Sequence, residues 1–583
     1  MGLREQYEWF LSKLTIFKWL SDYSSETLRN DLSAGVTVGV MLIPQGMAYA
    51  VLAGLPAIYG LYASLVPLLI YPLFATSRHL SVGIVAIDML IVAAGVGLIA
   101  EPGSDQYISL VILLGIFVGI TQIAMSVARL GFIVNLLSKP VIIGFTTAAP
   151  LIISFSQLGN LTGINLQQTQ YIYDIITELA GVWSELHLVT FIIGVSGILV
   201  LFAFNRFLPA APDALILVIL SSAAVWGMGL DQRGVEVVGS IDGGLPAPTI
   251  PAFSFEQLRR LVPTVLTLSL VQFMNVVTLG RTFASKYNYT ISPNRELWAI
   301  GTANLVGGFF RSIPISGSFS RSAVNEQAGG KTPLTNVFAG ILIGLTLLFL
   351  TPLFYYVPMP ALSAIIIVAS LGLIEIKQIR YLFRTKERDG YIALFTFITI
   401  LVIGIQEGIL LGVGASLVGV LIRASRPNVA ELGHISGSHF FRDIKRYPEA
   451  DRIRGLLVLR VDASFSFNNA EYFKEYIITK SEEENRTIEA VIIEGRSIND
   501  LDTTAIEALQ NVVESLQELN IDLHFAGLKG PIRDIMLRSG LARRLGGSHF
   551  HMTTHQAVQY ILQKWQQKDS SDHRLTDYMD TVD

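Results

Sequence analysis

Two Ser- and Gly-rich segments interrupt apolar stretches of the chain, and both carry groups that could hold an anion. Residues 77–83 read Ser-Arg-His-Leu-Ser-Val-Gly, and residues 312–321 read Ser-Ile-Pro-Ile-Ser-Gly-Ser-Phe-Ser-Arg. Each precedes a short apolar run, so each could mark the beginning of a helix. A helix N-terminus presents free backbone N–H groups and a partial positive charge, and both favour a bound anion. Arg321 would add a full positive charge.

A third polar position lies inside an apolar stretch near the N-terminus. Pro44 disturbs a helix there, and Gln45 places an amide among apolar residues, where a polar group needs a partner. Gln45 either hydrogen-bonds a bound oxyanion or joins two helices, as polar side chains do in bundles. Tyr49, one turn further on, either lines the same pocket or packs against neighbours.

The composition places most of the chain in a membrane. Of 583 residues, 51% are hydrophobic and 15% are charged. Charged residues make up about 27% of the last 154 positions but about 11% of the preceding 429. Residues 332–374 are uncharged throughout, which is enough for two spans of roughly 20 residues each. Membrane and soluble parts are therefore expected in one chain.

The same composition excludes several classes of protein. The net charge is -4, so there is no basic surplus for binding a nucleic-acid backbone. Cysteine is absent, which excludes disulfides, thiolate metal sites and cysteine catalysis. The nine histidines lack zinc-ligand spacing along the chain, so no metal site is predicted. The run Gly329–Thr332 imitates a phosphate-binding loop, but Asn325 stands where that loop needs glycine. No enzyme activity is predicted.

Apolar windows predict fourteen spans in two sets of seven. Lipid offers no partners for backbone groups, and the alternating pattern of a barrel is absent, so the spans are expected to be helices. An odd number of spans in each half means that two repeated halves would have inverted topologies. The first set lies at 34–52, 57–75, 82–99, 107–129, 132–156, 186–205 and 211–229. The second set lies at 262–282, 294–310, 319–329, 334–352, 360–378, 389–405 and 408–424.

The loops between the spans predict the orientation of the chain. Residues 156–185 contain no Lys or Arg, whereas 376–390 contain five, which places 376–390 and both termini in the cytoplasm. A cytoplasmic N-terminal segment is expected over 1–33, as an amphipathic surface helix with charges at Arg4, Glu5, Glu8, Lys13 and Lys18. Segments 77–83 and 312–321 then enter from opposite sides, with their helix N-termini facing each other near the midplane. The alternative is that both are loops at the membrane surface.

After the predicted transport domain (34–427), the pattern changes to a soluble α/β module over 436–565. Strands are expected at 456–461, 490–494 and 522–526, and helices at 469–479, 505–519 and 531–539. Alternating strands and helices predict a small, mostly parallel sheet. Residues 566–583 are polar and end in an acidic stretch, so they are predicted to be a disordered tail.

Four segments of the chain resemble the sulfate permease (SulP) family of anion transporters, to which prestin also belongs. They are Asp31–Gly35, Leu42–Ala50, Thr76–Gly83 and Gly317–Asn325. The soluble module resembles a STAS domain, and the match spans almost the whole chain. The resemblance implies a dimer with a uracil-permease-like fold of fourteen spans as 7+7 inverted repeats. It also implies a substrate site between the third and tenth helices, contacted by the first, at Gln45, Tyr49, Ser81, Gly83, Val85, Ser318, Ser320 and Arg321.

Two departures from the family pattern concern the coupling ion. Many members carry an acidic residue in the eighth helix, where this chain has Asn275, and many have proline where it has Ile84. Asp88 lies in the third helix and could replace the missing acid as the proton or sodium coupler. Its alternative role is structural pairing with a polar neighbour. No other cofactor is expected.

In the soluble module, Asp502 precedes the helix expected from 505 and can cap it. Some STAS relatives are phosphorylated at the position of Thr503, so the alternative is that Asp502 and Thr503 form a regulatory site. A cytoplasmic regulator is then a candidate partner.

These observations favour a secondary-active inorganic-anion transporter of the inner or plasma membrane, with sulfate as the first candidate. Bicarbonate, chloride and dicarboxylates remain open as substrates, as does an anion channel. The alternative of another class is a membrane-anchored STAS sensor or scaffold.

Overall fold

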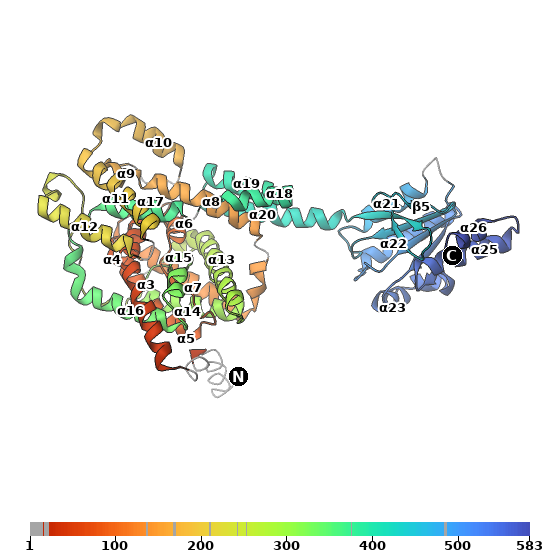
Figure 1. Ribbon diagram of the computed structural model, residues 1–583, viewed down its shortest axis with the longest axis horizontal. Helices are drawn as coiled ribbons and strands as arrows, with labels where there is room; N and C mark the ends of the chain where they lie inside the picture. The colour runs from red at the N-terminus through yellow and green to blue at the C-terminus, as the bar shows by residue number, and fades with distance from the viewer. Residues whose placement is uncertain are drawn as a thin grey trace. The chain divides into compact units, whose positions relative to one another are not determined.

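The computed structural model describes residues 15–16, 23–135, 138–166, 171–208, 211–241, 243–251, 254–372, 374, 376–482 and 487–582. The chain forms two compact units, Met1–Ser416 and Leu417–Asp583. The N-terminal surface helix predicted from Arg4, Glu5, Glu8, Lys13 and Lys18 lies outside the described residues. Each unit is described by itself below (Figure 1).

The first unit is helical, and a helix lies in each predicted apolar window. Eight helices of the described part are long and apolar enough to cross a membrane. The first half contains α3 Ser25–Leu52, α4 Ile58–Ala63, α5 Val66–Phe74, α6 Ala86–Val96, α7 Asp105–Val127, α8 Lys139–Ser156, α9 Leu158–Thr162, α10 Ile172–Gly181, α11 Leu188–Phe207 and α12 Asp213–Met228. The second half contains α13 Phe255–Lys286, α14 Pro293–Phe309, α15 Phe319–Gln327, α16 Leu334–Leu345, α17 Met359–Leu371, α18 Ile376–Thr385, α19 Glu387–Val402 and α20 Ile405–Ser425.

Two helices of this unit extend into segments that were predicted to lie outside the spans. The N-terminal segment was expected to continue to residue 33, but α3 begins at Ser25, capped by the Ser24 hydroxyl. Within this first part of α3, the buried Asp31 carboxylate accepts hydrogen bonds from the backbone N–H groups of Lys331 and Thr332. The basic stretch 376–390 is also not a simple loop, since most of it forms α18 and the start of α19.

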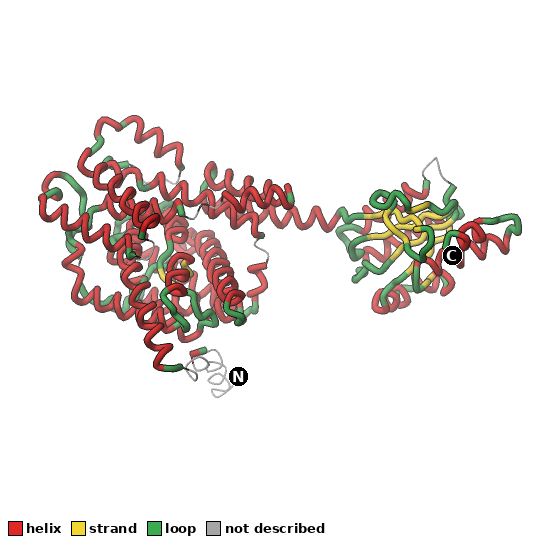
Figure 2. The backbone as a smooth tube through the Cα atoms, viewed as in Figure 1, coloured by secondary structure: helices red, strands yellow, loops and turns green. Residues whose placement is uncertain are grey.

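Two short strands interrupt the helices at the segments that the sequence singled out. Strand β1 (Ser81–Gly83) pairs antiparallel with β2 (Ser316–Ser318), with Ser81 opposite Ser318 and Gly83 opposite Ser316. All six residues are buried, and Figure 2 shows the pair among the helices of the first unit. Irregular backbone inside a membrane protein is stable only where protein or water satisfies its polar groups. The fold therefore places β1 and β2 in the protein interior.

The helices that follow the strands are too short to cross a bilayer. Helix α6 has 11 residues and α15 has nine, so each is at most about 17 Å long, against a hydrocarbon core of about 30 Å. Helix α15 begins directly after β2, and α6 begins three residues after the end of β1. Both segments are thus interrupted spans, and the alternative of surface loops is wrong.

The second unit contains one seven-stranded sheet in the order β4-β3-β6-β7-β8-β9, with β5 paired to β3. The three predicted strands are β6 Leu456–Val461, β7 Ala490–Glu494 and β8 Asp522–Ala526, and they pair in parallel as expected. The sequence missed β3 Val429–Ile435, β4 Phe441–Asp443, β5 Ala450–Asp451 and β9 Phe550–His551. Strand β3 lies between the predicted transport domain, which ends at 427, and the predicted soluble module, which begins at 436.

Helices cover both faces of this sheet. The predicted helices correspond to α21 Ala470–Ser481, α22 Thr503–Glu518 and α23 Gly530–Arg538, which are followed by α24 Leu541–Leu545. Apolar side chains of α21, α22, α23 and α24 pack on one face, and those of α25 (Thr554–Lys568) pack on the other.

Residues 566–583 were predicted to be a disordered tail. This prediction is wrong for the described part of the segment, which ends at 582. Helix α25 continues to Lys568, and α26 (Arg574–Asp580) follows it. Tyr578 is buried against the α25 face, and its hydroxyl lies 2.5 Å from His555 Nδ1. Arg574 forms ion pairs with Glu489 and Asp572. Tyr578, the partly buried Leu575, Met579 and Val582 side chains and the Arg574 ion pairs order a segment whose composition indicated disorder.

Candidate functional site

Arg321 is the centre of the candidate site. It lies in the first turn of α15 and is fully buried. Its Nε and Nη2 atoms have no hydrogen-bond partner among the described residues. A buried guanidinium without a counter-charge is costly, and an anion that accepts its hydrogen bonds would offset that cost. The geometry therefore favours an anion close to Arg321.

Gly83 lies against the Arg321 guanidinium. A Cβ on Gly83 would lie 3.2 Å from Arg321 Nη2 and 3.6 Å from Leu42 Cδ1. The φ angle of Gly83 is +143°, which residues with side chains rarely adopt. Glycine is thus required here both by the backbone and by the approach of the guanidinium. Leu42 belongs to α3, so this helix also lies beside Gly83.

The predicted serines lie on or beside the paired strands. The Ser81 hydroxyl, on β1, is buried without a hydrogen-bond partner among the described residues. Ser318, opposite it on β2, accepts a 3.5 Å hydrogen bond from the Arg321 N–H and lies 3.4 Å from the Ser320 hydroxyl. Ser320 itself is exposed. An unpredicted residue, Ser316, has a second buried hydroxyl without a partner in the described part of the chain.

The residues predicted from the first helix lie on α3. Gln45 is buried, and its side-chain oxygen has no partner among the described residues. Tyr49 is buried and lies near Arg321. Val85 is half-buried and is the extended residue that precedes α6. The structure thus brings Tyr49, Gly83 and Arg321 together. Gln45 lies on the same helix, three positions after Leu42, which is the α3 residue beside Gly83.

Two asparagines that the sequence analysis missed hold the strands in place. Asn336 accepts from Val82 N–H at 3.1 Å and donates to the Leu80 carbonyl at 3.0 Å. Asn304 likewise accepts from Ile315 N–H at 2.8 Å and donates to its carbonyl at 3.2 Å. Each amide therefore takes the place of a neighbouring strand. Since Asn336 and Val82 are 254 positions apart, no local pattern could have paired them.

Glu296 braces the segment that leads into β1. It is fully buried on α14 and accepts hydrogen bonds from the Tyr71 hydroxyl at 2.7 Å and the Thr76 and Ser77 N–H groups at 2.7 and 2.8 Å. The Thr76 hydroxyl donates to the same carboxylate. The brace positions β1 without itself belonging to the predicted site.

We expect Glu296→Ala to lower the free energy of unfolding by about 2 kcal/mol or more, because it leaves buried donors without acceptors. Glu296→Gln keeps an oxygen for the Thr76 and Ser77 N–H groups and should cost clearly less. Thermal unfolding of the detergent-solubilised chain checks this order. Equal unfolding temperatures for Glu296→Ala and the wild-type chain would contradict the brace.

The predicted coupling residue Asp88 lies in the first turn of α6. It is fully buried, and neither carboxylate oxygen has a hydrogen-bond partner within the described residues. Its polar neighbour is Gln272 on α13, whose amide oxygen accepts from Gln122 and Asn304. Asn275, the other coupling candidate, is half-buried one turn further along α13. The structure thus places Asp88 at a helix N-terminus that is also a candidate anion-binding position.

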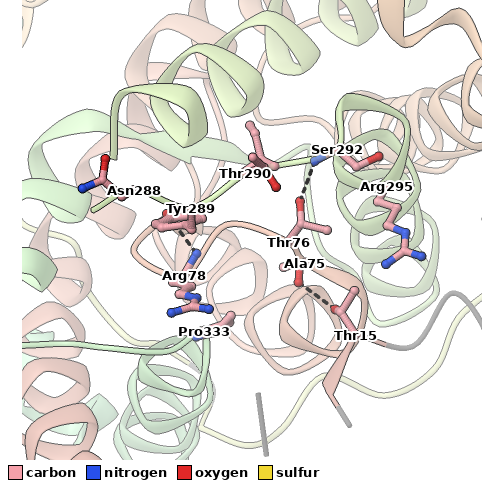
Figure 3. Close-up of a pocket in the computed structure, with 11 residues that line it drawn as sticks. Thr15, Ala75, Thr76, Arg78, Asn288, Tyr289, Thr290, Ser292, Arg295 and Pro333 are labelled. Carbon is pink, nitrogen blue, oxygen red and sulfur yellow. Dashed lines mark hydrogen bonds between the residues drawn. The ribbon is translucent and has the colours of Figure 1, made fainter. Parts of the chain in front are cut away.

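A pocket of about 630 Å³ lies beside the segment that leads into β1 (Figure 3). It contains none of the predicted substrate residues. Arg78 and Arg295 give its lining positive charge, and Arg78 N–H donates to the Tyr289 hydroxyl at 3.2 Å. On the other side, Ser292 N–H donates to the Thr76 hydroxyl at 3.2 Å. The pocket and the Glu296 brace thus share Thr76.

In the second unit, Asp502 caps α22. Its carboxylate accepts from Ala505 N–H at 2.9 Å and from Phe467 N–H at 2.7 Å. Thr503 begins the helix and is exposed. The capping role of Asp502 is therefore observed, and the hydroxyl of Thr503 is accessible.

Comparison with known proteins gives a consistent result. The model of the sulfate permease family matches residues 28–396, and that of the STAS domain matches 447–557. The chain is 35% identical to sulfate transporter 4.1, chloroplastic, of Arabidopsis thaliana, over 98% of this chain and 85% of that protein. It is 34% identical to a probable sulfate transporter of Mycobacterium tuberculosis, over 92% and 96% of the two chains.

Solved structures share the fold at lower sequence identity. A structure of SLC26A9 superimposes with a TM-score of 0.89 at 22% identity, covering 98% of this chain and 96% of that one. The transmembrane domain of the cyanobacterial bicarbonate transporter BicA gives a TM-score of 0.58 at 21% identity, over 68% of this chain and 98% of that domain. At these identities the likeness concerns the fold alone.

Proposed function

The chain belongs to the sulfate permease family, and from that premise we propose that it is a secondary-active transporter of an inorganic oxyanion, with sulfate as the first candidate. The observation that carries the proposal is the fully buried Arg321, whose guanidinium lacks a counter-charge in the described structure. Relatives at 34–35% identity that are named sulfate transporters support the choice of substrate.

In this proposal the anion binds between the N-termini of α6 and α15. The helix ends supply backbone N–H groups, and Arg321 supplies the full charge. The Ser81 hydroxyl lacks a partner in the described structure, so it is available to donate a hydrogen bond to a tetrahedral oxyanion. Gln45 would donate from its side-chain NH₂ group, because its amide oxygen can only accept. Tyr49, Gly83, Val85, Ser318 and Ser320 complete the proposed lining.

Transport requires that the site open to each side in turn. Because β1 and β2 are paired and clamped by Asn336 and Asn304, we propose that α6, α15 and the strands move as one body. The basic pocket at Arg78 and Arg295 would then raise the local anion concentration on one side of the membrane.

Uptake of radiolabelled sulfate, bicarbonate and a dicarboxylate into proteoliposomes, with and without a pH gradient, tests the function. Saturable sulfate uptake is the expected result. Saturable uptake of bicarbonate or a dicarboxylate without sulfate would change the substrate. A non-saturating anion current would indicate a channel, and no flux of any anion would favour the sensor or scaffold.

The chain's surroundings and assembly are part of the proposal. We place it in the inner or plasma membrane with both termini in the cytoplasm, which protease accessibility of terminal tags in intact cells and inverted vesicles tests. A homodimer is proposed from the family resemblance, and light scattering of the detergent-solubilised chain would measure it. The coupling ion is proposed to be H⁺ or Na⁺.

A regulatory role is proposed for the end of α22 that carries Asp502 and Thr503. Phosphate on the exposed Thr503 would lie at a helix N-terminus, where negative charge is favourable. Mass spectrometry of the chain from its native cells should find the modification, and Thr503→Ala should change uptake only where the modification is present. Unmodified Thr503 together with wild-type uptake by Thr503→Ala would contradict regulation and leave Asp502 as a cap.

A further inference from the structure

Three histidines that are scattered in the sequence meet in the second unit. His524 lies on β8, His551 lies on the neighbouring β9, and His549 precedes β9 by one residue. The His524 ring lies 4.6 Å from that of His549, and His524 Nδ1 lies 3.1 Å from His551 Nε2. The sequence predicted no metal site because these residues lack local ligand spacing. The parallel pairing of β8 with β9 provides the proximity instead.

A carboxylate lies beside the imidazoles. Asp522 is two positions before His524 on β8, so both side chains point to the same face of the sheet. One ligand atom from each of Asp522, His524 and His549 lies within 4.8 Å of the others. Tetrahedral Zn²⁺ with bonds of about 2.0–2.1 Å separates its ligands by about 3.4 Å. Asp522 and His549 are half-buried, so small side-chain rotations can close the difference.

His524 carries the strongest sign of a missing ligand. The residue is fully buried, and its Nε2 atom has no hydrogen-bond partner among the described residues. With Nδ1 engaged by His551, an Nε2 lone pair is free to bind a metal, and a partner on the other ring nitrogen is the usual arrangement for a metal-binding histidine.

We propose that Asp522, His524 and His549 bind a divalent transition metal, for which Zn²⁺ is the probe. The two imidazole ligands favour Zn²⁺, Cu²⁺ or Ni²⁺ over Mg²⁺ and Ca²⁺, which prefer oxygen ligands alone. His551 orients His524 from the second coordination sphere, and water completes the tetrahedron. The site lies within the second unit and does not depend on the transport proposal.

Lys564 provides a further test of the proposal, because its ammonium group competes with the metal for the Asp522 carboxylate. Its Nζ lies 2.7 Å from Asp522 Oδ2, and its side chain is 51% exposed. An incoming cation must displace this ammonium or share the carboxylate with it. Removing the lysine charge should therefore tighten metal binding, whereas a purely structural cluster would gain nothing from it.

The test is Zn²⁺ titration of the full chain in detergent, purified with an affinity tag that contains no histidine. The chain has no cysteine, so thiolates contribute no background binding. The wild-type chain should bind one equivalent and unfold at a higher temperature with Zn²⁺. His549→Ala and Asp522→Asn, which alter half-buried residues, should weaken binding by at least about 100-fold, more than loss of a second-sphere partner costs. Lys564→Gln should strengthen it roughly two- to fivefold.

The matched control is His573→Ala, which removes an exposed histidine of the same unit and should bind like the wild-type chain. Replacing Zn²⁺ with Co²⁺ should give the visible absorption of a tetrahedral site in the wild-type chain and in His573→Ala. Absence of saturable Zn²⁺ binding by the wild-type chain would overturn the proposal. Unchanged affinity in both His549→Ala and Asp522→Asn would overturn it as well.

Discussion

Arg321→Met should abolish saturable anion uptake and leave the chain at least as stable as the wild type. Met has a similar length and no charge, so the substitution removes the cost of burying a guanidinium without a partner. The same change removes charge-assisted hydrogen bonds to the anion, each worth about 1.5–3 kcal/mol. Apparent affinity should therefore fall by about 100-fold or more. Proteoliposome uptake and thermal unfolding of the same preparation measure the two effects.

A substitution that lowers anion uptake without lowering stability identifies a binding residue, whereas loss of a structural residue would lower both. Arg259→Met is the matched control, because it removes one exposed arginine from the start of α13 and should change neither quantity much. Sulfate should raise the unfolding temperature of the wild-type chain and of Arg259→Met but not of Arg321→Met. Normal uptake by Arg321→Met would exclude Arg321 from the site.

Asp88→Asn should remove the dependence of anion accumulation on the pH gradient. Asp88 is buried, and its polar neighbour Gln272 is an uncharged amide, so ionising the carboxyl group is costly. An ionised Asp88 in the first turn of α6 would also repel an anion bound at that helix end. Proton and anion therefore favour each other's binding, which is the linkage that a symporter needs.

The size of the effect follows from the energetics of one proton. A gradient of one pH unit is worth about 1.4 kcal/mol, so coupling to one proton should change sulfate accumulation about tenfold per unit. In Asp88→Asn, which resembles the protonated state, accumulation should be flat with pH. Steady-state accumulation at several imposed pH and Na⁺ gradients measures it. If accumulation by the wild-type chain depends on the Na⁺ gradient and Asp88→Asn loses that dependence, Na⁺ is the coupling ion.

Asp213→Asn is the matched control for this experiment. Asp213 is also in the first turn of a helix, α12, but its carboxylate accepts a hydrogen bond from Ala214 N–H at 2.8 Å. We expect this variant to keep the wild-type response to both gradients. If Asp88→Asn also keeps that response, Asp88 is a structural residue and the coupling proposal fails.

The interrupted helices were predictable from the sequence because their cause is local. A Ser- and Gly-rich segment before a short apolar run shows where a span breaks, and Arg321 shows where charge enters the membrane. Gly83 marks a backbone angle that other residues rarely adopt. The strands β6, β7 and β8 were predictable for the same reason, since each is a compact apolar run between polar helices.

The sequence alone therefore determined the membrane and soluble parts, the breaks in two spans and the residue types near them, because composition and periodicity act over a few turns of chain. Only the tertiary structure decided that β1 pairs with β2, that Asn336, Asn304 and Glu296 hold this pair, and that His524 meets His549 and Asp522. It also ordered α26 through the burial of Tyr578. These contacts join residues from separate elements, and hydrogen bonding and burial between distant segments leave no local pattern in the sequence.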